Sequence, residues 1–234
     1  MSYRVIQWGT GNVGLFSLRC IIEHPETELV GVCVHSAAKA GRDAGELCGT
    51  QPVGVKASND VEAMLALDAD CVCYTATADL RPFEAAQDIC RILAAGKNVV
   101  SSSLVPLVHP KSFLPNLRDQ LAEACRAGGT SFFTSGIDPG FANDLLPLAL
   151  MGTCKSIEQV RCMEILDYAT YDSPVVMFDV MGFGKPMDEI PMLLHTGVLS
   201  LAWGSVIRQL AAGLGIELDG IEETYVREPA PEDF

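Results

Sequence analysis

The sequence predicts an α/β protein with a doubly wound parallel sheet, followed by a second α+β domain that this chain contains only in part. Strand-like apolar segments alternate with helical segments over residues 1–150, and residues 28–35 form a nearly continuous apolar run. Strands separated by helices are expected to be parallel, because a parallel neighbour needs a crossover connection. Continuous apolar strands are typical of a sheet that is covered on both faces.

Six strands and four helices are expected in this first domain. Pro25 follows the first helix and Gly96 follows the third, which are usual places for a helix to end. Ser58 or Asn59 is expected to cap the second helix. We predict strands at 3–8, 28–35, 53–55, 71–75, 98–102 and 130–134, and helices at 12–23, 61–67, 82–95 and 112–127.

The pattern changes after Gly152, so we divide the chain into a first domain at 1–150 and a second at 151–234. Residues 156–169 alternate as in a long strand, and residues 193–214 have the apolar spacing of a strong helix. The final residues, 227–234, are rich in proline and acidic side chains, which is typical of a connecting loop. We therefore expect the second domain to be incomplete in this chain.

Composition excludes several classes of function. The chain has 234 residues with 16 Lys and Arg against 30 Asp and Glu, a net charge of −14 that argues against nucleic-acid binding. No uncharged run is long enough to cross a bilayer, and the first residues lack the pattern of a signal peptide. The nine cysteines are scattered, which fits a reduced cytoplasm. The four histidines are dispersed and the cysteines lack ligand spacing, so no metal site is predicted.

A glycine-rich turn carries the main functional signal. It has the pattern G-x-G-x-x-G, follows the first strand and opens the first helix, which is the context that dinucleotide binding requires. The first glycine permits a tight turn, the second lets the backbone approach a diphosphate, and the third lets the helix pack against the strand. A helix N-terminus attracts anions, so an acidic protein is able to hold such a cofactor here. The predicted contacts are Gly9, Thr10, Gly11, Asn12, Val13 and Gly14.

The end of the second strand indicates which nicotinamide cofactor is bound. Proteins that bind NAD usually place an acidic residue there, about 20 residues after the glycines. His35 and Ser36 occupy this position, and Lys39 and Arg42 follow them. A hydroxyl and two cations favour the 2′-phosphate of NADP, and NAD remains the alternative. Small residues at the ends of the fourth and fifth strands are expected to line the nicotinamide ribose, namely Thr75, Ala76, Thr77, Ser101 and Ser102.

These segments resemble a known family. The stretches RVIQWGTGNVG, ELVGVCVHSAAKAGRDAGEL, GKNVVSSS and SGIDPGFANDLLP are similar to the 2,4-diaminopentanoate dehydrogenase-like group, which is also labelled dihydrodipicolinate reductase-like and includes native amine dehydrogenases. The resemblance spans about Tyr3 to Phe234. It implies a Rossmann domain, a second α+β domain, NAD(P) and a homodimer, in members that are longer than this chain. It also implies that the turn after the sixth strand lies beside the substrate, with Gly136, Ile137, Asp138, Pro139 and Asn143 lining the pocket.

The chain departs from this family at the residues that would transfer protons. Family amine dehydrogenases carry acidic residues just after the fifth strand, where this sequence has the stretch from Ser103 to Leu107 without a carboxylate. The paired-histidine motif of dihydrodipicolinate reductases is also missing. His109, in the loop after the fifth strand, is the remaining candidate for a catalytic proton donor or acceptor, and an exposed loop histidine is the competing interpretation.

We therefore expect an oxidoreductase that transfers hydride between NADP(H) and a small carbonyl, imine or amine. One alternative is an amine dehydrogenase or dihydrodipicolinate reductase proper that uses other proton-transfer residues. The other alternative is a non-catalytic sensor that binds NADP. The expected partners are a small-molecule substrate and a second copy of the chain.

Overall fold

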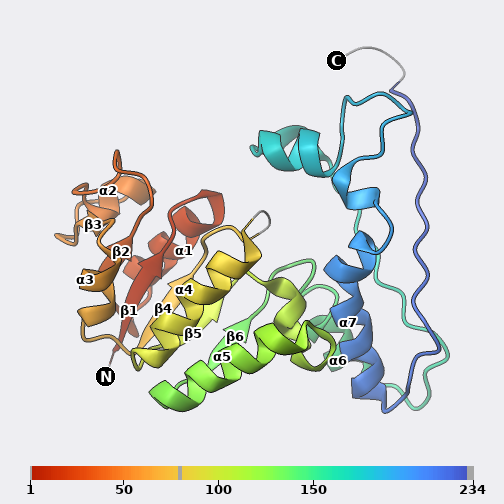
Figure 1. The fold of residues 1–234 in the computed structure, drawn as a ribbon, viewed down its shortest axis with the longest axis horizontal. Coiled ribbons are helices and arrows are strands. Elements are labelled where there is room, and N and C mark those ends of the chain that lie inside the picture. The colour runs from red at the N-terminus through yellow and green to blue at the C-terminus, as the bar shows by residue number, and fades with distance from the viewer. Residues whose placement is uncertain (1, 79–80, 231–234) are drawn as a thin grey trace. The chain divides into compact units, whose positions relative to one another are not determined.

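A computed structural model describes residues 2–78 and 81–230, which form two compact units. The first unit comprises Met1–Leu107 and Phe113–Gly136, and the second comprises Val108–Ser112 and Ile137–Phe234 (Figure 1). The boundary thus falls earlier than the expected one at residue 150. The physical reason is helix α6 (Leu145–Met151), in which Leu148 packs over Gly213 of helix α7 (Val198–Leu214). Residues 231–234, at the end of the acidic stretch, lie outside the described residues.

The first unit is built on one parallel sheet, as predicted. Its strand order is β3-β2-β1-β4-β5-β6, and every neighbouring pair is parallel. The order reverses between β1 and β4, which is the switch point where ligands bind in doubly wound sheets. The strands are β1 (Tyr3–Trp8), β2 (Thr27–Cys33), β3 (Ala57–Ser58), β4 (Cys71–Tyr74), β5 (Asn98–Ser101) and β6 (Phe132–Thr134).

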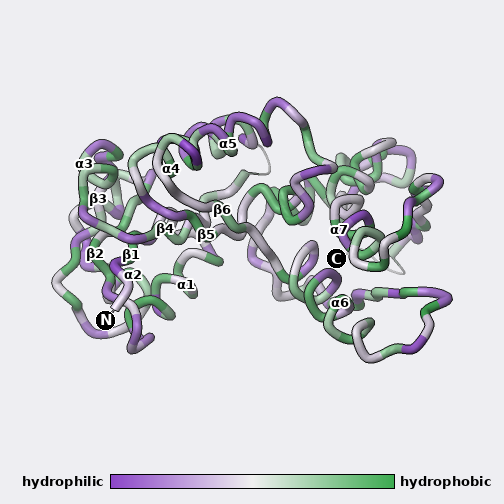
Figure 2. The backbone as a smooth tube through the Cα atoms, turned by 90° about the horizontal axis from the view of Figure 1, so that it is seen from below, coloured by the Kyte–Doolittle hydropathy of each residue, from purple (hydrophilic) through white to green (hydrophobic). Residues whose placement is uncertain are grey.

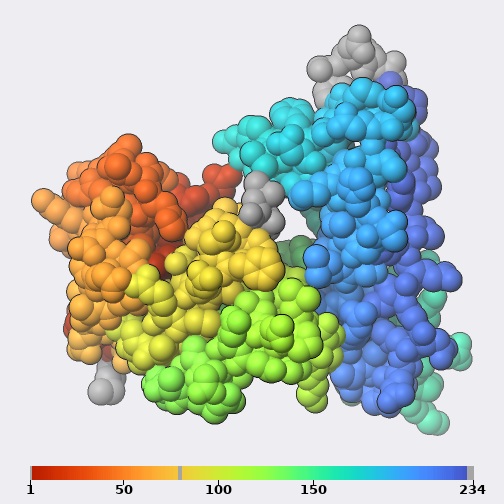
Figure 3. Space-filling model, in the orientation of Figure 1, coloured from red at the N-terminus to blue at the C-terminus, as the bar shows by residue number. Residues whose placement is uncertain are grey.

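Helices cover the two faces of this sheet. Figure 2 shows α4 and α5 on one side of the strands and α1 on the other. A large core on the α4 and α5 side includes the stacked rings of Trp8 and Tyr74, and a smaller core on the α1 side centres on Leu18 and Val32. Figure 3 shows α4, in yellow, and α5, in green, covering the strands in that view. The helices are α1 (Asn12–Glu23), α2 (Ala44–Cys48), α3 (Val61–Ala66), α4 (Pro82–Ala94) and α5 (Pro115–Gly128).

Two local predictions in this unit are wrong. The third strand lies at 57–58 rather than 53–55, because the carboxylate of Asp43 accepts hydrogen bonds from the N–H groups of Val53 and Gly54 and holds that segment in a loop. Gly54 also has a φ of +82°, which a regular strand does not adopt. The cap of α3 is Asp60, whose side chain accepts from the Ala63 N–H at 3.0 Å.

The second unit is irregular apart from α6 and α7. Shorter turns occur at Pro110–Ser112, Tyr168–Thr170 and Met192–Leu194, with a π-helix at Val175–Val180. The strand predicted at 156–169 is wrong: within the described part of this unit no strand forms. A strand is stable only when a neighbour pairs with its backbone, and this segment has none. The helix predicted at 193–214 begins later, at Val198, because Gly197 has a φ of +88°.

Candidate functional site

The glycine turn has the tight geometry that its pattern predicts. Gly9 has a φ of +93°, and a Cβ placed on it would lie 2.8 Å from the backbone nitrogen of Ala76, just after β4. A Cβ on Gly14 would lie 2.3 Å from the carbonyl oxygen of Gly9 and 2.8 Å from the Oγ1 of Thr75. Both glycines are therefore required by packing inside the first unit.

Gly11 differs from its two neighbours in the motif. It is exposed, and a Cβ on it would meet no atom within 4 Å. It stands at the N-cap position of α1, where it provides no side-chain cap, and the first turn of α1 has no acidic residue. The N–H groups of a first helical turn have no acceptor within the helix, and they carry partial positive charge. This open, side-chain-free helix end fits a diphosphate, so the residues present suit a dinucleotide cofactor.

A buried polar network beneath the turn holds it in place. The side-chain amide of Gln7, which is fully buried, donates to the Gly9 carbonyl at 2.8 Å and to the Thr75 Oγ1 at 2.7 Å. Its oxygen accepts from the Ser17 hydroxyl on α1 at 2.8 Å. The network thus connects β1, the turn, the end of β4 and α1. Sequence reasoning missed Gln7, although a polar residue inside an apolar strand was the available signal.

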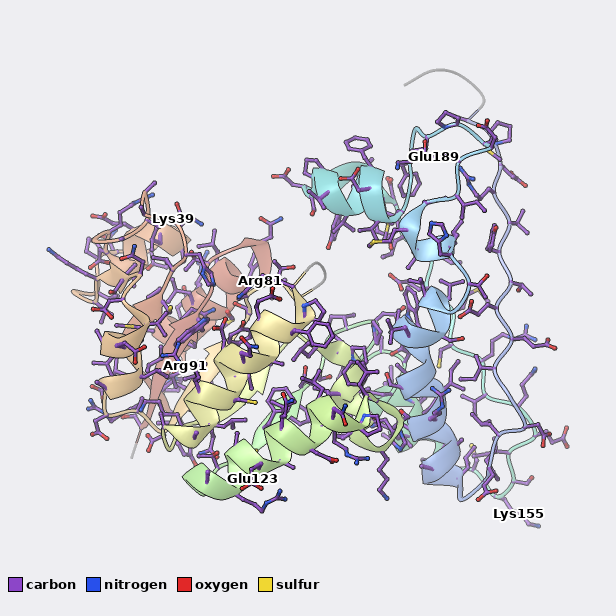
Figure 4. All side chains as sticks on the ribbon, viewed as in Figure 1. Lys39, Arg81, Arg91, Glu123, Lys155 and Glu189 are labelled. Atoms are coloured by element: carbon purple, nitrogen blue, oxygen red, sulfur yellow. The ribbon has the colours of Figure 1, made fainter. Side chains whose placement is uncertain are left out.

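The loop after β2 brings a cation to the glycine turn. His35 and Ser36 are exposed, as is Arg42. The ammonium group of Lys39 donates to the Thr10 carbonyl at 2.6 Å and lies 3.3 Å from the Thr10 Oγ1. In Figure 4, Lys39 and Arg81 lie toward the same end of the sheet, whereas Arg91 lies toward the other. The contact between Lys39 and Thr10, which lie 29 residues apart in the sequence, therefore places positive charge beside the predicted diphosphate site.

The acidic residue nearest in sequence to these cations is engaged by backbone groups. The pKa of Asp43 is lowered, chiefly by the N–H of Val53, with further contributions from the N–H groups of Gly54 and Gly45. Its carboxylate accepts from these three groups at 2.8–3.0 Å. Asp43 therefore serves to hold its own loop rather than to pair with Lys39 or Arg42.

The predicted residues at the strand ends have different environments. Thr75 bonds within the turn, Ala76 is buried and Thr77 is exposed. The hydroxyl of Ser101 is buried, donates to the Tyr74 carbonyl at 2.9 Å and accepts from the Ser103 N–H at 2.8 Å. These bonds give the Ser101 hydroxyl a structural role at the ends of β4 and β5. Ser102, in contrast, is only half-buried.

His109 lies in the second unit, where its Nδ1 is 2.9 Å from the Ser112 hydroxyl. Burial lowers the pKa of His109, and the positive charges of Lys111 and Arg208 lower it further. These surroundings disfavour the charged imidazole, which makes a local hydrogen bond.

The turn at residues 137–144 gathers several of the predicted substrate residues. Asn143 accepts from the Gly140 N–H at 2.9 Å, and its amide donates to the Oδ1 of Asp138. The same Oδ1 accepts from the indole N–H of Trp203 on α7 at 2.6 Å. Pro139 follows Asp138 within this turn, and Ile137 is exposed, whereas Gly136 ends the first unit.

Glu164 is a functional candidate that sequence reasoning missed. The pKa of Glu164 is raised to about 7, first by hydrogen bonding with Asp138, then by partial burial and by the negative charge of Asp138. The two residues are 26 positions apart on segments without regular structure, so nothing in the local sequence indicates that they meet.

An open pocket lies in the same unit as Asp138 and Glu164. It has a volume of about 600 Å³ and is lined by residues between 166 and 183. Tyr168 is its central ring, with Tyr171 at 5.9 Å and Phe183 at 5.8 Å between ring centroids. The pKa of Tyr168 is raised by burial first and then by the charges of Glu164, Tyr171 and Asp138. Tyr168 therefore belongs to the pocket wall and also interacts electrostatically with Glu164 and Asp138.

Two other features are absent from the part of the chain that the structure describes. No group of three or more His, Cys, Asp or Glu side chains there is arranged to hold a metal ion. Among the same residues, no helix combines the length and the apolar character needed to cross a membrane.

Comparison with known proteins identifies the relatives of this chain. No family model matches it. It is 46% identical over 223 residues to an amine dehydrogenase of Streptomyces virginiae, in a match that covers 95% of this chain and 62% of that protein. Over most of its own length, the chain is therefore similar to a protein named an amine dehydrogenase. It is also 24% identical to the 2,4-diaminopentanoate dehydrogenase of Acetoanaerobium sticklandii, over 92% of this chain and 61% of that enzyme.

These comparisons confirm the resemblance inferred from the sequence. This chain spans about three-fifths of the length of both curated relatives, since the matches cover 62% and 61% of them. A solved structure of amine dehydrogenase from Mycobacterium smegmatis is also similar, with a TM-score of 0.59 and 22% identity. The match covers 68% of this chain and 46% of the solved chain. That likeness supports the fold.

Proposed function

We propose that this chain belongs to an NAD(P)-dependent oxidoreductase that transfers hydride between NADP(H) and a small carbonyl, imine or amine. The observation that carries the proposal is the Gly9–Gly14 turn, with two glycines required by packing and a third that is open to a ligand. The relative at 46% identity, named an amine dehydrogenase, favours an amine and its carbonyl or imine partner among these substrates.

The residues of the first unit have distinct parts in this function. The N-terminus of α1 and the bare backbone at Gly11 hold the diphosphate. The Gln7 network fixes the turn so that its N–H groups are preorganised. When bound, the nicotinamide supplies or accepts the hydride. Thr75, Ala76, Thr77, Ser101 and Ser102 remain our prediction for the wall beside the nicotinamide ribose.

NADP is proposed as the preferred cofactor over NAD. No carboxylate follows β2 at His35 and Ser36, so a 2′-phosphate would meet no negative charge there. Lys39 already lies against Thr10, Arg42 is exposed nearby in sequence, and the carboxylate of Asp43 is engaged by its own loop. Two cations and a hydroxyl are the groups that recognise an additional phosphate.

A homodimer in a reducing cytoplasm is the proposed setting. The family resemblance supports the dimer, and the cysteines support the compartment, since all nine are free in the described part of the chain. Light scattering on the purified protein would test the dimer, because a monomer at all concentrations would contradict it.

The proposed activity is tested in two steps on the same protein. NADPH binding is measured first by calorimetry, with NADH as the comparison ligand. Absorbance at the NADPH band is then followed with panels of ketones plus ammonia, imines and primary amines. Turnover on one of these panels is the expected result. Tight NADPH binding without turnover on any of them would instead favour a cofactor-binding sensor, and the absence of binding would contradict both.

A further inference from the structure

Three consecutive serines lie at the carboxyl end of β5, and their environments are unequal. Ser101 and Ser103 are buried, with 4% and 7% of their surface exposed, whereas Ser102 is half-buried. The N–H of Ser102 donates to the Tyr74 carbonyl at 3.3 Å and so extends the pairing of β5 with β4. Its hydroxyl has no hydrogen-bond partner among the residues that the structure describes. A paired backbone thus carries an unused hydroxyl at the end of the sheet where ligands bind in doubly wound folds.

Ser103 connects the loops that follow β4 and β5. Its hydroxyl donates to the carbonyl of Ala76, and its N–H donates to the Ser101 hydroxyl at 2.8 Å. Ala76 also lies against the glycine turn, since a Cβ on Gly9 would be 2.8 Å from the backbone nitrogen of Ala76. Ala76 is therefore held both by the turn that is expected to bind the diphosphate and by Ser103.

Thr134, the last residue of β6, holds Ser103 from the neighbouring strand. The hydroxyl of Thr134 donates to the Ser103 carbonyl at 2.7 Å, and both residues are buried. The Ser103 carbonyl, N–H and hydroxyl are thus all engaged, by three different residues. Because β4, β5 and β6 are neighbours in the sheet, these bonds join the carboxyl ends of three adjacent strands at one residue.

The chain leaves Ser103 through a strained residue. Leu104 has a φ of +55°, in the left-handed region that a leucine rarely adopts. Its side chain is 5% exposed and belongs to the large core of the first unit. Such a conformation persists only where the surroundings over-determine it, and residues of this kind gather at ligand-binding sites. The bonds of Ser103 and the burial of Leu104 supply this constraint, so the backbone beside Ser102 is preorganised.

We propose that Ser103 is a positioning residue that keeps the Ser102 hydroxyl in place to form a hydrogen bond with the nicotinamide half of the cofactor. This inference rests on the proposed function and divides the work at this strand end: Ser102 contacts the cofactor, and Ser103 acts through it. A neutral hydroxyl suits this half of the cofactor, because the nicotinamide ribose and carboxamide carry groups that both donate and accept hydrogen bonds.

The test compares two ligands by calorimetry, NADPH and 2′-phospho-ADP. The second ligand has the adenine, the 2′-phosphate and the diphosphate but lacks the nicotinamide and its ribose. Ser102→Ala should lower the affinity for NADPH about fivefold, which is the loss of one neutral hydrogen bond, and leave the affinity for 2′-phospho-ADP unchanged. Because the Ser102 hydroxyl has no partner in the described protein, its removal should leave the urea midpoint of unfolding unchanged.

Two matched substitutions near the two ends of β6 separate positioning from stability. Thr134→Val removes the hydroxyl that holds Ser103, whereas Thr130→Val removes a hydroxyl that donates to the Leu93 carbonyl at 3.1 Å, before β6 begins. Both variants should have a lower urea midpoint. Thr134→Val alone should also bind NADPH about threefold more weakly relative to 2′-phospho-ADP. Ser103→Ala should change this ratio in the same direction, and Thr134→Ser, which keeps the hydroxyl, should retain the wild-type ratio.

Circular dichroism verifies that each variant is folded. An unchanged ratio of the two affinities in Ser102→Ala, or an equal change of that ratio in Thr134→Val and Thr130→Val, would overturn the inference. The second ligand keeps this result distinct from failure of the proposed function. A wild-type protein that binds neither ligand contradicts the cofactor site itself, whereas binding of both ligands in the same ratio by every variant contradicts the positioning alone.

Discussion

The side-chain amide of Gln7 donates to the carbonyl of Gly9 at 2.8 Å, and this bond joins a buried strand residue to the turn that the cofactor is expected to contact. The same amide bonds to Thr75, and the Gln7 oxygen accepts from Ser17. Because Gln7 is fully buried, its own side-chain amide has no water as an alternative partner. The conformation of the turn is thus held by the Gln7 side chain as well as by its own glycines.

Replacing Gln7 by Leu should therefore weaken both stability and cofactor binding. The substitution keeps the volume and leaves buried polar groups without partners, at a cost of about 2 kcal/mol in the free energy of unfolding. Urea denaturation measures this loss, and NADPH titration measures the effect on binding. Gln51→Leu at an exposed position is the matched control and should change stability by less than about 0.5 kcal/mol. Equal stability of the two variants would show that the network is not needed.

The three motif glycines should respond differently to alanine. Gly11→Ala meets no neighbour, so the protein should remain folded with a change in stability of less than about 1 kcal/mol. Its NADPH affinity should fall about tenfold or more, because the new methyl group occupies the space of the diphosphate. Calorimetry on the folded variant checks this. Gly220→Ala, which is also unobstructed, should bind NADPH like the wild type.

Gly14→Ala should instead fail at the level of folding. The added Cβ would meet the backbone oxygen of Gly9 at 2.3 Å, and a backbone atom in a tight turn is unable to move away cheaply. We expect a loss of about 2–3 kcal/mol despite the higher helix propensity of alanine. Thermal denaturation measures the loss. A Gly14→Ala protein as stable as Gly11→Ala would contradict the close packing of α1 on this turn.

Cofactor choice should depend on the loop after β2. In the double variant Lys39→Ala and Arg42→Ala, the affinity for NADP should fall about tenfold more than the affinity for NAD, since the 2′-phosphate loses two cations. Arg118→Ala and Arg126→Ala together remove two surface cations from α5 and serve as the control. An unchanged ratio of NADP to NAD affinity in the loop variant would show that Lys39 and Arg42 do not contribute to the choice between the two cofactors.

The stability of the protein should carry the signature of Glu164. The folded pKa of Glu164 is about 7, above its ordinary value of 4.5, so the native state binds more protons than the unfolded state between these two values. Stability therefore falls as pH rises from about 4.5 to 7 through this group. Its exposure limits the effect to ~1 kcal/mol at most. Urea denaturation across this range should show a weaker fall in Glu164→Gln, and an identical slope in both proteins would contradict the shifted pKa.

Local sequence was sufficient for the regular part of the first unit. The bounds of β1 and α1 agree with prediction because each has a complete local signal: an apolar run, a glycine turn, a helical repeat and a terminating His-Pro. The third strand was misplaced because the residue that decides it, Asp43, acts from outside the segment through its bonds to Val53 and Gly54. The strand propensity of three residues contains no information about hydrogen bonds to a side chain outside them.

The sequence by itself determined the parallel sheet and the tight glycine turn, because hydrophobic periodicity and glycine geometry are properties of neighbouring residues. The tertiary structure alone decided which side chains meet across long separations. Gln7 reaches Thr75, Lys39 reaches Thr10, and Asp138 gathers Glu164 and Trp203. Hydrogen bonds and shared protons act over about 3 Å in space whatever the distance along the chain, so these contacts exist only once the backbone is folded.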